Sequence, residues 1–223
     1  MENINNKHRI YRIFVSSPFS LKTQRALIHK AIHKTGHLPI MMEEAPAEDS
    51  SIENVILEAL SNSDIYILLL GHRYGSKLKD KDISYTEWEY NLAKDQKDIY
   101  KIHLLQDNEE VKDMRMKLDI NSQTDSQERQ NEERFNVFYG ALKSSGLFSA
   151  YWKEKDSDFL SNFAMTVTTA IHKAENYLKS NQPEKGLIPA KNYKDIDSID
   201  QSSKNQLRTE IRQALNLFNE LDQ

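Results

Sequence analysis

Hydrophobic residues along this chain alternate between short runs typical of strands and spaced patterns typical of helices. The run at residues 65–70 is continuous, as expected of a central parallel strand that is covered on both faces. The apolar residues between the runs recur at helical spacing after Ser20 and after Ser84, and both serines are suitable N-cap residues. The predicted strands are residues 10–15, 38–42, 65–70, 99–105 and 148–152.

Strict alternation of strands and helices predicts right-handed βαβ units and therefore a parallel sheet. The fold class is α/β, with about five strands and helices on both faces of the sheet. A long amphipathic pattern at residues 159–178 is expected to close the domain. We therefore expect one α/β domain over residues 1–180.

Two segments break this regularity. Residues near 107–137 are highly charged and poor in apolar side chains, which predicts a charged helical insertion. Residues 181–201 contain two prolines and a glycine and are predicted to be a linker. Residues 202–223 follow, with apolar positions at alternating steps of four and three, which predicts a C-terminal amphipathic helix. This helical extension is compatible with packing on the parent domain and equally with self-association into a homo-oligomer.

Composition and charge narrow the classes of function. The 223-residue chain has no cysteine, which excludes a thiolate nucleophile and a cysteine metal site. No apolar run approaches the roughly 18 residues that span a bilayer. The first residues also lack the apolar core of a signal peptide, so we expect a cytoplasmic protein without a membrane role. The net charge of -4 argues against nucleic-acid binding.

The predicted sheet places a ligand site at one edge. In a doubly wound sheet, ligands bind beyond the carboxyl ends of the strands, where the strand order reverses. For the order 2-1-3-4-5, the loops at residues 16–20 and 71–83 meet there, and the helix after Ser84 directs its N-terminus nearby. Free N–H groups at such a place favour an anion, and Arg73 offers a fork for phosphate. The phosphate-loop pattern GxxxxGK(S/T) is absent, which excludes a P-loop NTPase.

Two carboxylates on the helix after Ser84 are candidates for chemistry. Ser84 and Glu87 have the spacing of a capping box, so the start of the helix accounts for Glu87. Glu89 has no such role and lies on the flank of the aromatic face that contains Trp88. A carboxylate beside a partly buried aromatic face is a place where a shifted pKa or a sugar contact arises. Glu89 is therefore the catalytic candidate, with a solvated surface glutamate as the alternative.

Several residues around the same edge are candidates for substrate binding. Ser16 and Ser17 are able to donate to a phosphate or ribose, although turn and cap roles also explain them. Tyr74 offers a ring for stacking on a base, or alternatively covers the edge of the sheet. The expected binding set also includes Phe19, Arg73, Ser84 and Trp88.

The histidines do not predict a metal site. His29, His33 and His37 are four residues apart, a spacing that suits a metal on a helix. Gly36 interrupts the helix before His37, however, and no acidic residue is spaced with the trio. We therefore expect no metal.

Four segments in order, IFVSSPFSLKTQR, GHLPIMMEEAP, SDIYILLLGHRYGS and ISYTEWEYNLA, resemble a bacterial family that is TIR-like and known as a domain of unknown function, DUF4062. The resemblance covers residues 11–105. It implies a flavodoxin-like sheet and kinship with TIR domains and nucleoside deoxyribosyltransferases, which break or exchange N-glycosidic bonds. Enzymatic TIR domains carry an essential glutamate on the helix after the third strand, commonly in a W-x-x-E context. Here Trp88 and Glu89 are adjacent, and the resemblance implies Glu89 as the counterpart by position.

The resemblance leads to three hypotheses. The leading one is a TIR-like enzyme that cleaves or cyclises NAD at the N-glycosidic bond, with NAD as substrate and no cofactor, in bacterial antiphage defence with a partner protein. The second is a non-catalytic module that binds a nucleotide or a protein. The third is a nucleoside transferase that uses the same carboxylate as a nucleophile.

Overall fold

Five parallel strands form a single sheet in the order β2-β1-β3-β4-β5. The computed structural model describes residues 9–41, 51–79, 81–119, 121–183 and 185–186. The order confirms the predicted flavodoxin-like α/β fold. The strands are β1 (Arg12–Ser16), β2 (Leu38–Met41), β3 (Ile65–Leu70), β4 (Tyr100–Gln106) and β5 (Phe148–Trp152).

The helices follow the strands along the chain, as the alternation predicts. One helix separates each of the first three strands from the next, and three consecutive helices lie between β4 and β5. The helices are α1 (Lys22–Lys34), α2 (Ser51–Ser61), α3 (Tyr85–Lys94), α4 (Asn108–Met116), α5 (Gln123–Gln130), α6 (Glu132–Ser144) and α7 (Phe159–Asn181).

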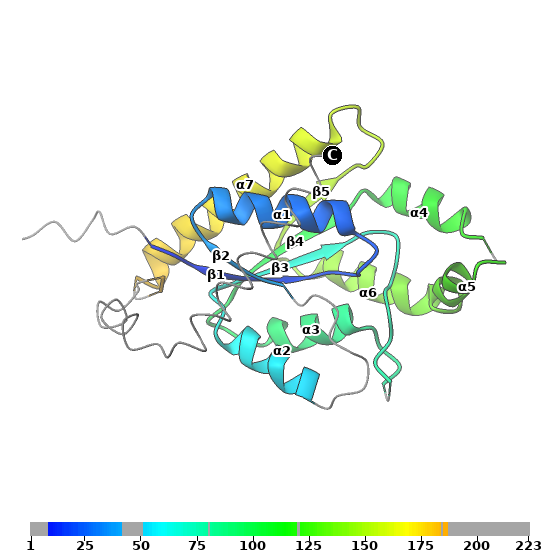
Figure 1. The fold of residues 1–223 in the computed structure, drawn as a ribbon, viewed down its shortest axis with the longest axis horizontal. Coiled ribbons are helices and arrows are strands. Elements are labelled where there is room, and N and C mark those ends of the chain that lie inside the picture. Colours follow the sequence, from blue (N-terminus) through cyan, green and yellow to red (C-terminus); the bar gives the residue numbers. More distant parts are fainter. Residues whose placement is uncertain (1–8, 42–50, 80, 120, 184, 187–223) are drawn as a thin grey trace, which may run out of the picture. The chain divides into compact units, whose positions relative to one another are not determined.

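The helices form a layer on each face of the sheet. Helices α1 and α7 pack against one face, and α2, α3 and α6 pack against the other (Figure 1). A hydrophobic cluster lies on each face of the sheet. Because side chains along a strand point alternately to the two faces, Ile67 of β3 belongs to the cluster beneath α1 and α7, and Leu68 belongs to the cluster beneath α2, α3 and α6. All six residues of β3 are buried, which explains the continuous apolar run in the sequence.

Local signals set the helix ends that shape the site. The Ser84 side chain accepts the backbone N–H of Glu87 at 3.1 Å, so α3 begins where the serine predicts. Gly36 follows the last residues of α1 with a φ of 78°, a conformation that favours glycine.

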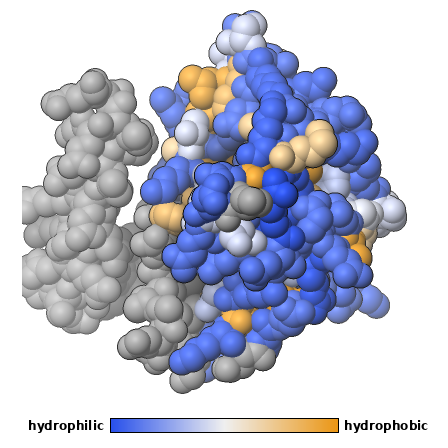
Figure 2. Space-filling view, turned by 90° about the vertical axis from the view of Figure 1, so that its right-hand side faces the viewer, coloured by the Kyte–Doolittle hydropathy of each residue, from blue (hydrophilic) through white to orange (hydrophobic). Residues whose placement is uncertain are grey.

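The charged segment near 107–137 is helical and forms α4, α5 and the start of α6. Helices α4 and α5 lie at the end of the sheet to which the strands point (Figure 1). Figure 2 shows this side of the molecule, which is mainly hydrophilic with scattered hydrophobic side chains. In the described ranges, no helix is long and apolar enough to cross a membrane.

The structure follows the chain past the predicted end of the domain at residue 180. Helix α7 continues to Asn181, and the Gly186 carbonyl accepts the backbone N–H of Ile10 at 3.0 Å. Most of the predicted linker at 181–201 and all of the predicted helix at 202–223 lie outside the described residues. Their separation from the domain and the self-association of the helix stay predictions.

Candidate active site

Glu89 lies inside the molecule at the carboxyl edge of the sheet. Its side chain is on α3, and the residue is only 7% exposed. The Ser16 hydroxyl at the end of β1 donates a hydrogen bond to Glu89 Oε2 at 2.5 Å. A contact between residues 73 positions apart, at the point where the strand order reverses, is what the doubly wound topology favours.

The sheet register explains why these two side chains meet. Ser16 pairs with Leu68 of β3, and α3 covers the face of the sheet to which both side chains point. The loops after β1 and β3 also converge. A Cβ placed on Gly75 would lie 3.4 Å from Pro18 Cβ, so the two loops are in van der Waals contact.

Burial dominates the electrostatics of Glu89. It raises the pKa of Glu89 to about 7, against an ordinary value of 4.5. The Ser16 hydrogen bond and the positive charge of Arg25 lower that pKa, but they do not cancel the effect of burial. Near neutral pH this carboxyl is therefore present in both ionisation states, a property common among catalytic acids and bases.

Arg25 is a site residue that the sequence prediction missed. It lies on α1, is buried, and donates from Nη1 to the Ser17 hydroxyl at 2.6 Å. A signal was present in the sequence, because Arg25 falls on the helix face of Leu21, Ile28 and Ile32, where an apolar residue is expected. A buried arginine on an apolar face indicates a special environment.

Tyr66 is a second residue that the prediction missed. Its side chain on β3 is fully buried, and its hydroxyl has no hydrogen-bond partner among the described residues. Burial, and next the charge of Glu89, raise the pKa of Tyr66 well above its usual value. The tyrosine lies within an apolar run, so the periodicity gave no reason to single it out.

The structure pairs Arg73 with a carboxylate other than Glu89. Arg73 is partly exposed, and its Nη2 forms an ion pair with Asp125 Oδ1 on α5 at 2.7 Å. The fork that was predicted to hold a phosphate therefore points to a carboxylate of the charged segment. The two residues are 52 positions apart, so the local sequence does not reveal the pair.

Tyr74 is also engaged elsewhere. It is fully buried, its ring meets the Phe138 ring edge to face, and its hydroxyl donates to the Glu87 carboxylate. No face of this ring is open for stacking on a base. The backbone N–H groups of Tyr74 and Gly75 donate to the Glu128 carboxylate at 2.7 and 3.1 Å, so an internal carboxylate takes the donors that were expected to bind an anion.

The remaining predicted binding residues have distinct surroundings. Ser84 is fully buried and caps α3. Trp88 is nearly buried, with Lys81 Nζ 5.0 Å from its ring centroid. Phe19 is 46% exposed, and Lys22 lies over its ring at 4.7 Å. Of these three, Phe19 presents an open aromatic surface on the loop after β1.

The structure thus brings Ser16, Glu89, Arg25 and Tyr66 together, with Ser17 bonded to Arg25 at the rim. The group combines a carboxyl, hydroxyl donors and one cation, which suits a sugar with an attached anion. Nowhere in the described part of the chain do three His, Asp or Glu side chains form a group that could hold a metal ion.

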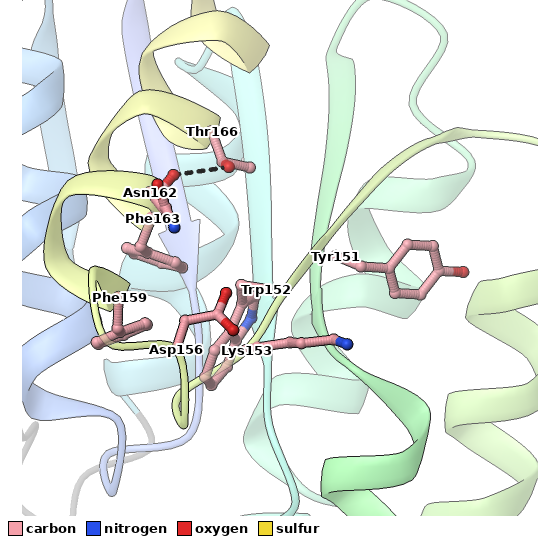
Figure 3. Close-up of a pocket in the computed structure, with 8 residues that line it drawn as sticks. All are labelled: Tyr151, Trp152, Lys153, Asp156, Phe159, Asn162, Phe163 and Thr166. Carbon is pink, nitrogen blue, oxygen red and sulfur yellow. Dashed lines mark hydrogen bonds between the residues drawn. The ribbon is translucent and has the colours of Figure 1, made fainter.

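A pocket of about 210 Å³ lies between the end of β5 and the start of α7 and shares no residue with the Glu89 group. In Figure 3, Tyr151 points away from the other side chains that line it. The rings of Trp152, Phe159 and Phe163 contact one another, which accounts for them as core packing. The lining residues are Tyr151, Trp152, Lys153, Asp156, Phe159, Asn162, Phe163 and Thr166.

Comparison with known proteins bears on the family. A family model described as Domain of unknown function (DUF4062) matches residues 12–158. The match extends past residue 105, where the resemblance read from the sequence ends, and includes α4, α5, α6 and β5. No curated protein matches the chain significantly.

Proposed function

Since this chain belongs to the family described as a domain of unknown function (DUF4062), we propose its function from the chemistry of its own site. It is a TIR-like nucleotide-processing enzyme that breaks the N-glycosidic bond of NAD, by hydrolysis or by cyclisation. The observation that carries this proposal is the buried Glu89 carboxyl. It accepts a hydrogen bond from Ser16 at the carboxyl ends of β1 and β3, where the strand order reverses.

The reaction breaks the bond between C1′ of the ribose and the ring nitrogen of nicotinamide. The electron pair leaves with nicotinamide, which becomes a neutral base because the bound pyridinium was positively charged. Positive charge then develops on the ribose, and the ionised form of Glu89 stabilises it. Water that adds to C1′ and loses a proton completes hydrolysis, whereas attack by an adenine nitrogen completes cyclisation.

The neighbours of Glu89 have roles in this proposal. Ser16 donates to Glu89 or to a ribose hydroxyl, and Ser17 follows it at the start of the loop after β1. Arg25 is the cation that influences Glu89, so it takes the part that the sequence assigned to Arg73 and faces the phosphates. Phe19 offers its exposed ring to a base.

One observation favours a second candidate, a nucleoside transferase. Arg73 is paired with Asp125, and the N–H groups of Tyr74 and Gly75 are bonded to Glu128. The loop after β3 therefore has fewer free donors for a pyrophosphate than the sequence predicts, and a neutral nucleoside needs none. In this case ionised Glu89 attacks C1′, and the first base leaves with the electron pair and takes up a proton. A nitrogen of the second base then bonds to C1′, displaces the carboxylate and gives up its own proton, so the exchange balances.

Base release from purified protein tests the proposal and separates it from its rivals. NAD and a set of nucleosides are incubated separately with wild type, Glu89→Gln and Glu87→Gln, and free base is measured by chromatography. Glu89→Gln keeps the shape of the side chain and removes its charge, so we expect a loss of about 100-fold or more. The matched control Glu87→Gln lies on the same helix and is expected to retain activity.

Equal base release by wild type and Glu89→Gln would overturn the catalytic assignment. Release from nucleosides and none from NAD would favour the transferase. If neither substrate is turned over at protein concentrations that promote assembly, nucleotide binding measured by calorimetry would favour the non-catalytic module. Antiphage defence and a partner protein belong to the same proposal and rest on the resemblance to TIR domains. A homo-oligomer rests instead on the amphipathic helix predicted at residues 202–223.

A further inference from the structure

Tyr66 has a buried polar atom that packing alone does not explain. In β3 it is the one residue with a polar side chain, among Ile65, Ile67 and three leucines. The hydroxyl is buried, and within the part of the chain that the structure describes no partner meets the geometry of a hydrogen bond, although the Ser16 side chain is close enough to lower the pKa of Tyr66. Burying a hydroxyl without a partner is unfavourable, and phenylalanine would fill the same space without that cost. A buried polar group without a partner calls for an explanation, and the residues next to the Tyr66 hydroxyl offer one.

The sheet places this hydroxyl beside Ser16 and Glu89. Phe14 pairs with Tyr66 and Ser16 pairs with Leu68, so Tyr66 and Ser16 are diagonal neighbours on one face of the sheet. The Phe14 ring stacks on the Tyr66 ring with centroids 6.0 Å apart, which fixes the direction of the tyrosine. Helix α3 covers this face and brings Glu89 close enough to raise the pKa of Tyr66, although burial is the larger cause.

Ser16 has a single hydroxyl proton, and it is used in the hydrogen bond that Ser16 donates to Glu89. A ligand in this crevice with a phosphate or hydroxyl oxygen would compete for that proton. Glu89 would then lose the donor that holds it while its carboxyl is still buried, with the charge of Arg25 acting on it. An ionised carboxyl in such a place needs another donor.

We propose that Tyr66 is a positioning residue whose hydroxyl donates to Glu89 when a ligand takes the Ser16 hydroxyl. The ligand in this statement rests on the proposed function, and the exchange of donors explains how Glu89 stays oriented through a turnover. Two further groups face this pair: the charge of Arg25 on α1 lowers the pKa of Glu89, and Tyr90 on α3, together with Glu89, raises the pKa of Tyr66.

A titration of the Glu89 carboxyl tests this exchange without any substrate. The chain is labelled with ¹³C at glutamate side chains, and the Glu89 resonance is assigned by its loss in Glu89→Gln. Ser16→Ala imitates the state in which Ser16 no longer donates. We expect Tyr66→Phe to raise the pKa of Glu89 by about one unit in the Ser16→Ala background and by much less in the wild-type background.

An equal shift in both backgrounds would overturn the exchange. A shift that is present with Ser16 and disappears in Ser16→Ala would also overturn it, because it would show that Tyr66 acts on Glu89 only through Ser16. Tyr11→Phe is the matched control, since the Tyr11 hydroxyl is also buried and has no hydrogen-bond partner among the described residues, but its residue belongs to the hydrophobic cluster on the opposite face. It is expected to leave the titration unchanged.

The titration result can be distinguished from the result of the base-release assay that tests the proposed function. The titration reports on Glu89, Ser16 and Tyr66 in the protein alone, whereas base release reports on turnover. If base is released, Tyr66→Phe should also move the acidic limb of the kcat profile to higher pH, because kcat reports the pKa of Glu89 in the complex with substrate. A tyrosine that only fills space would change neither the titration nor that limb.

Discussion

The Tyr74 hydroxyl donates a hydrogen bond to the Glu87 carboxylate and so belongs to the cap of α3. The same hydroxyl accepts the backbone N–H of Ser84 at 3.2 Å, while the Ser84 side chain accepts the N–H of Glu87. In an ordinary capping box the glutamate itself would accept the N–H of the capping residue. Here a tyrosine from the preceding loop is inserted between the two, so the loop after β3 and the start of α3 are joined.

Tyr74→Phe should therefore destabilise the protein. The change removes a donor from Glu87 and an acceptor from the buried N–H of Ser84. We expect the free energy of unfolding to fall by about 1–3 kcal/mol, measured by urea unfolding. Tyr151→Phe is the control, because Tyr151 is 49% exposed, and it should have almost no effect. Equal stability of the two variants would show that the bridge contributes nothing.

Because its pKa is raised in the folded protein, Glu89 should make the free energy of unfolding fall as pH rises. The folded protein raises the pKa of Glu89 from 4.5 to about 7, so between these values the folded state binds more protons than the unfolded state. The stabilising contribution is complete below about pH 4.5 and is lost as pH rises through about 7, a change of about 3 kcal/mol. Glu89→Gln should remove it.

The measurement is the difference in unfolding free energy between wild type and Glu89→Gln at several pH values. The comparison is needed because His103 acts in the opposite direction. Burial lowers the pKa of His103 to about 4, so its effect stabilises the fold as pH rises from about 4 to 6.5. That effect is common to both proteins and cancels. A difference that does not change between pH 4.5 and 8 would contradict the raised pKa.

The proposed reaction should show the same carboxyl in its kinetics. Ionised Glu89 is the form that stabilises positive charge on the ribose, and it becomes the major form above pH 7. We therefore expect kcat/KM for base release to rise about tenfold per pH unit well below pH 7 and to level off above it. A rate that falls over this range would indicate that the protonated carboxyl is the active form, as in a general acid.

Gly75 should resist substitution because of its backbone conformation. Its φ of 90° lies in a region that side chains rarely adopt, and the surrounding loop packs on Pro18. Gly75→Ala is expected to cost about 1–2 kcal/mol, measured by thermal unfolding. It should also lower any base release, because it displaces the loop that borders Ser17.

Gly140→Ala is the matched control on α6. A Cβ at this position meets no atom within 4 Å, and the residue lies in a regular helix. Replacing a helical glycine by alanine should raise stability by about 0.5–1 kcal/mol. Opposite signs for the two substitutions would support the conformational argument, whereas a loss at both positions would argue for a general effect of added volume.

The sheet was largely predictable because local signals determine it. The segments Ile65–Leu70 and Phe148–Trp152 match their strands residue for residue, and alternation with the handedness of βαβ units predicts a parallel sheet. The order 2-1-3-4-5 is the one that the resemblance to a flavodoxin-like family implies. The meeting of Ser16 and Glu89 follows from the same rules, since the strand order reverses beside β1.

The other contacts of the site were not predictable from local pattern. Arg73 and Tyr74 look available in the sequence, but Asp125 and Glu128 occupy their side chain and backbone donors from a segment about 50 residues away. The charged segment near 107–137 has the composition of a solvated surface, and that composition does not show that some of its carboxylates are buried. Tyr66 was overlooked for the converse reason, because an apolar run conceals one hydroxyl.

The contact between Glu128 and Gly75 has a consequence for how this domain can be exchanged with its relatives. Glu128 is buried, both of its carboxylate oxygens accept N–H groups of the loop after β3, and Arg115 lies 3.7 Å from it. A chimera that imports a different loop without α5 would leave this carboxylate without its donors, at a cost of several kcal/mol, about 3–5 for a broken buried pair. The loop after β3 and α5 therefore form one structural unit, and a chimera should replace both together.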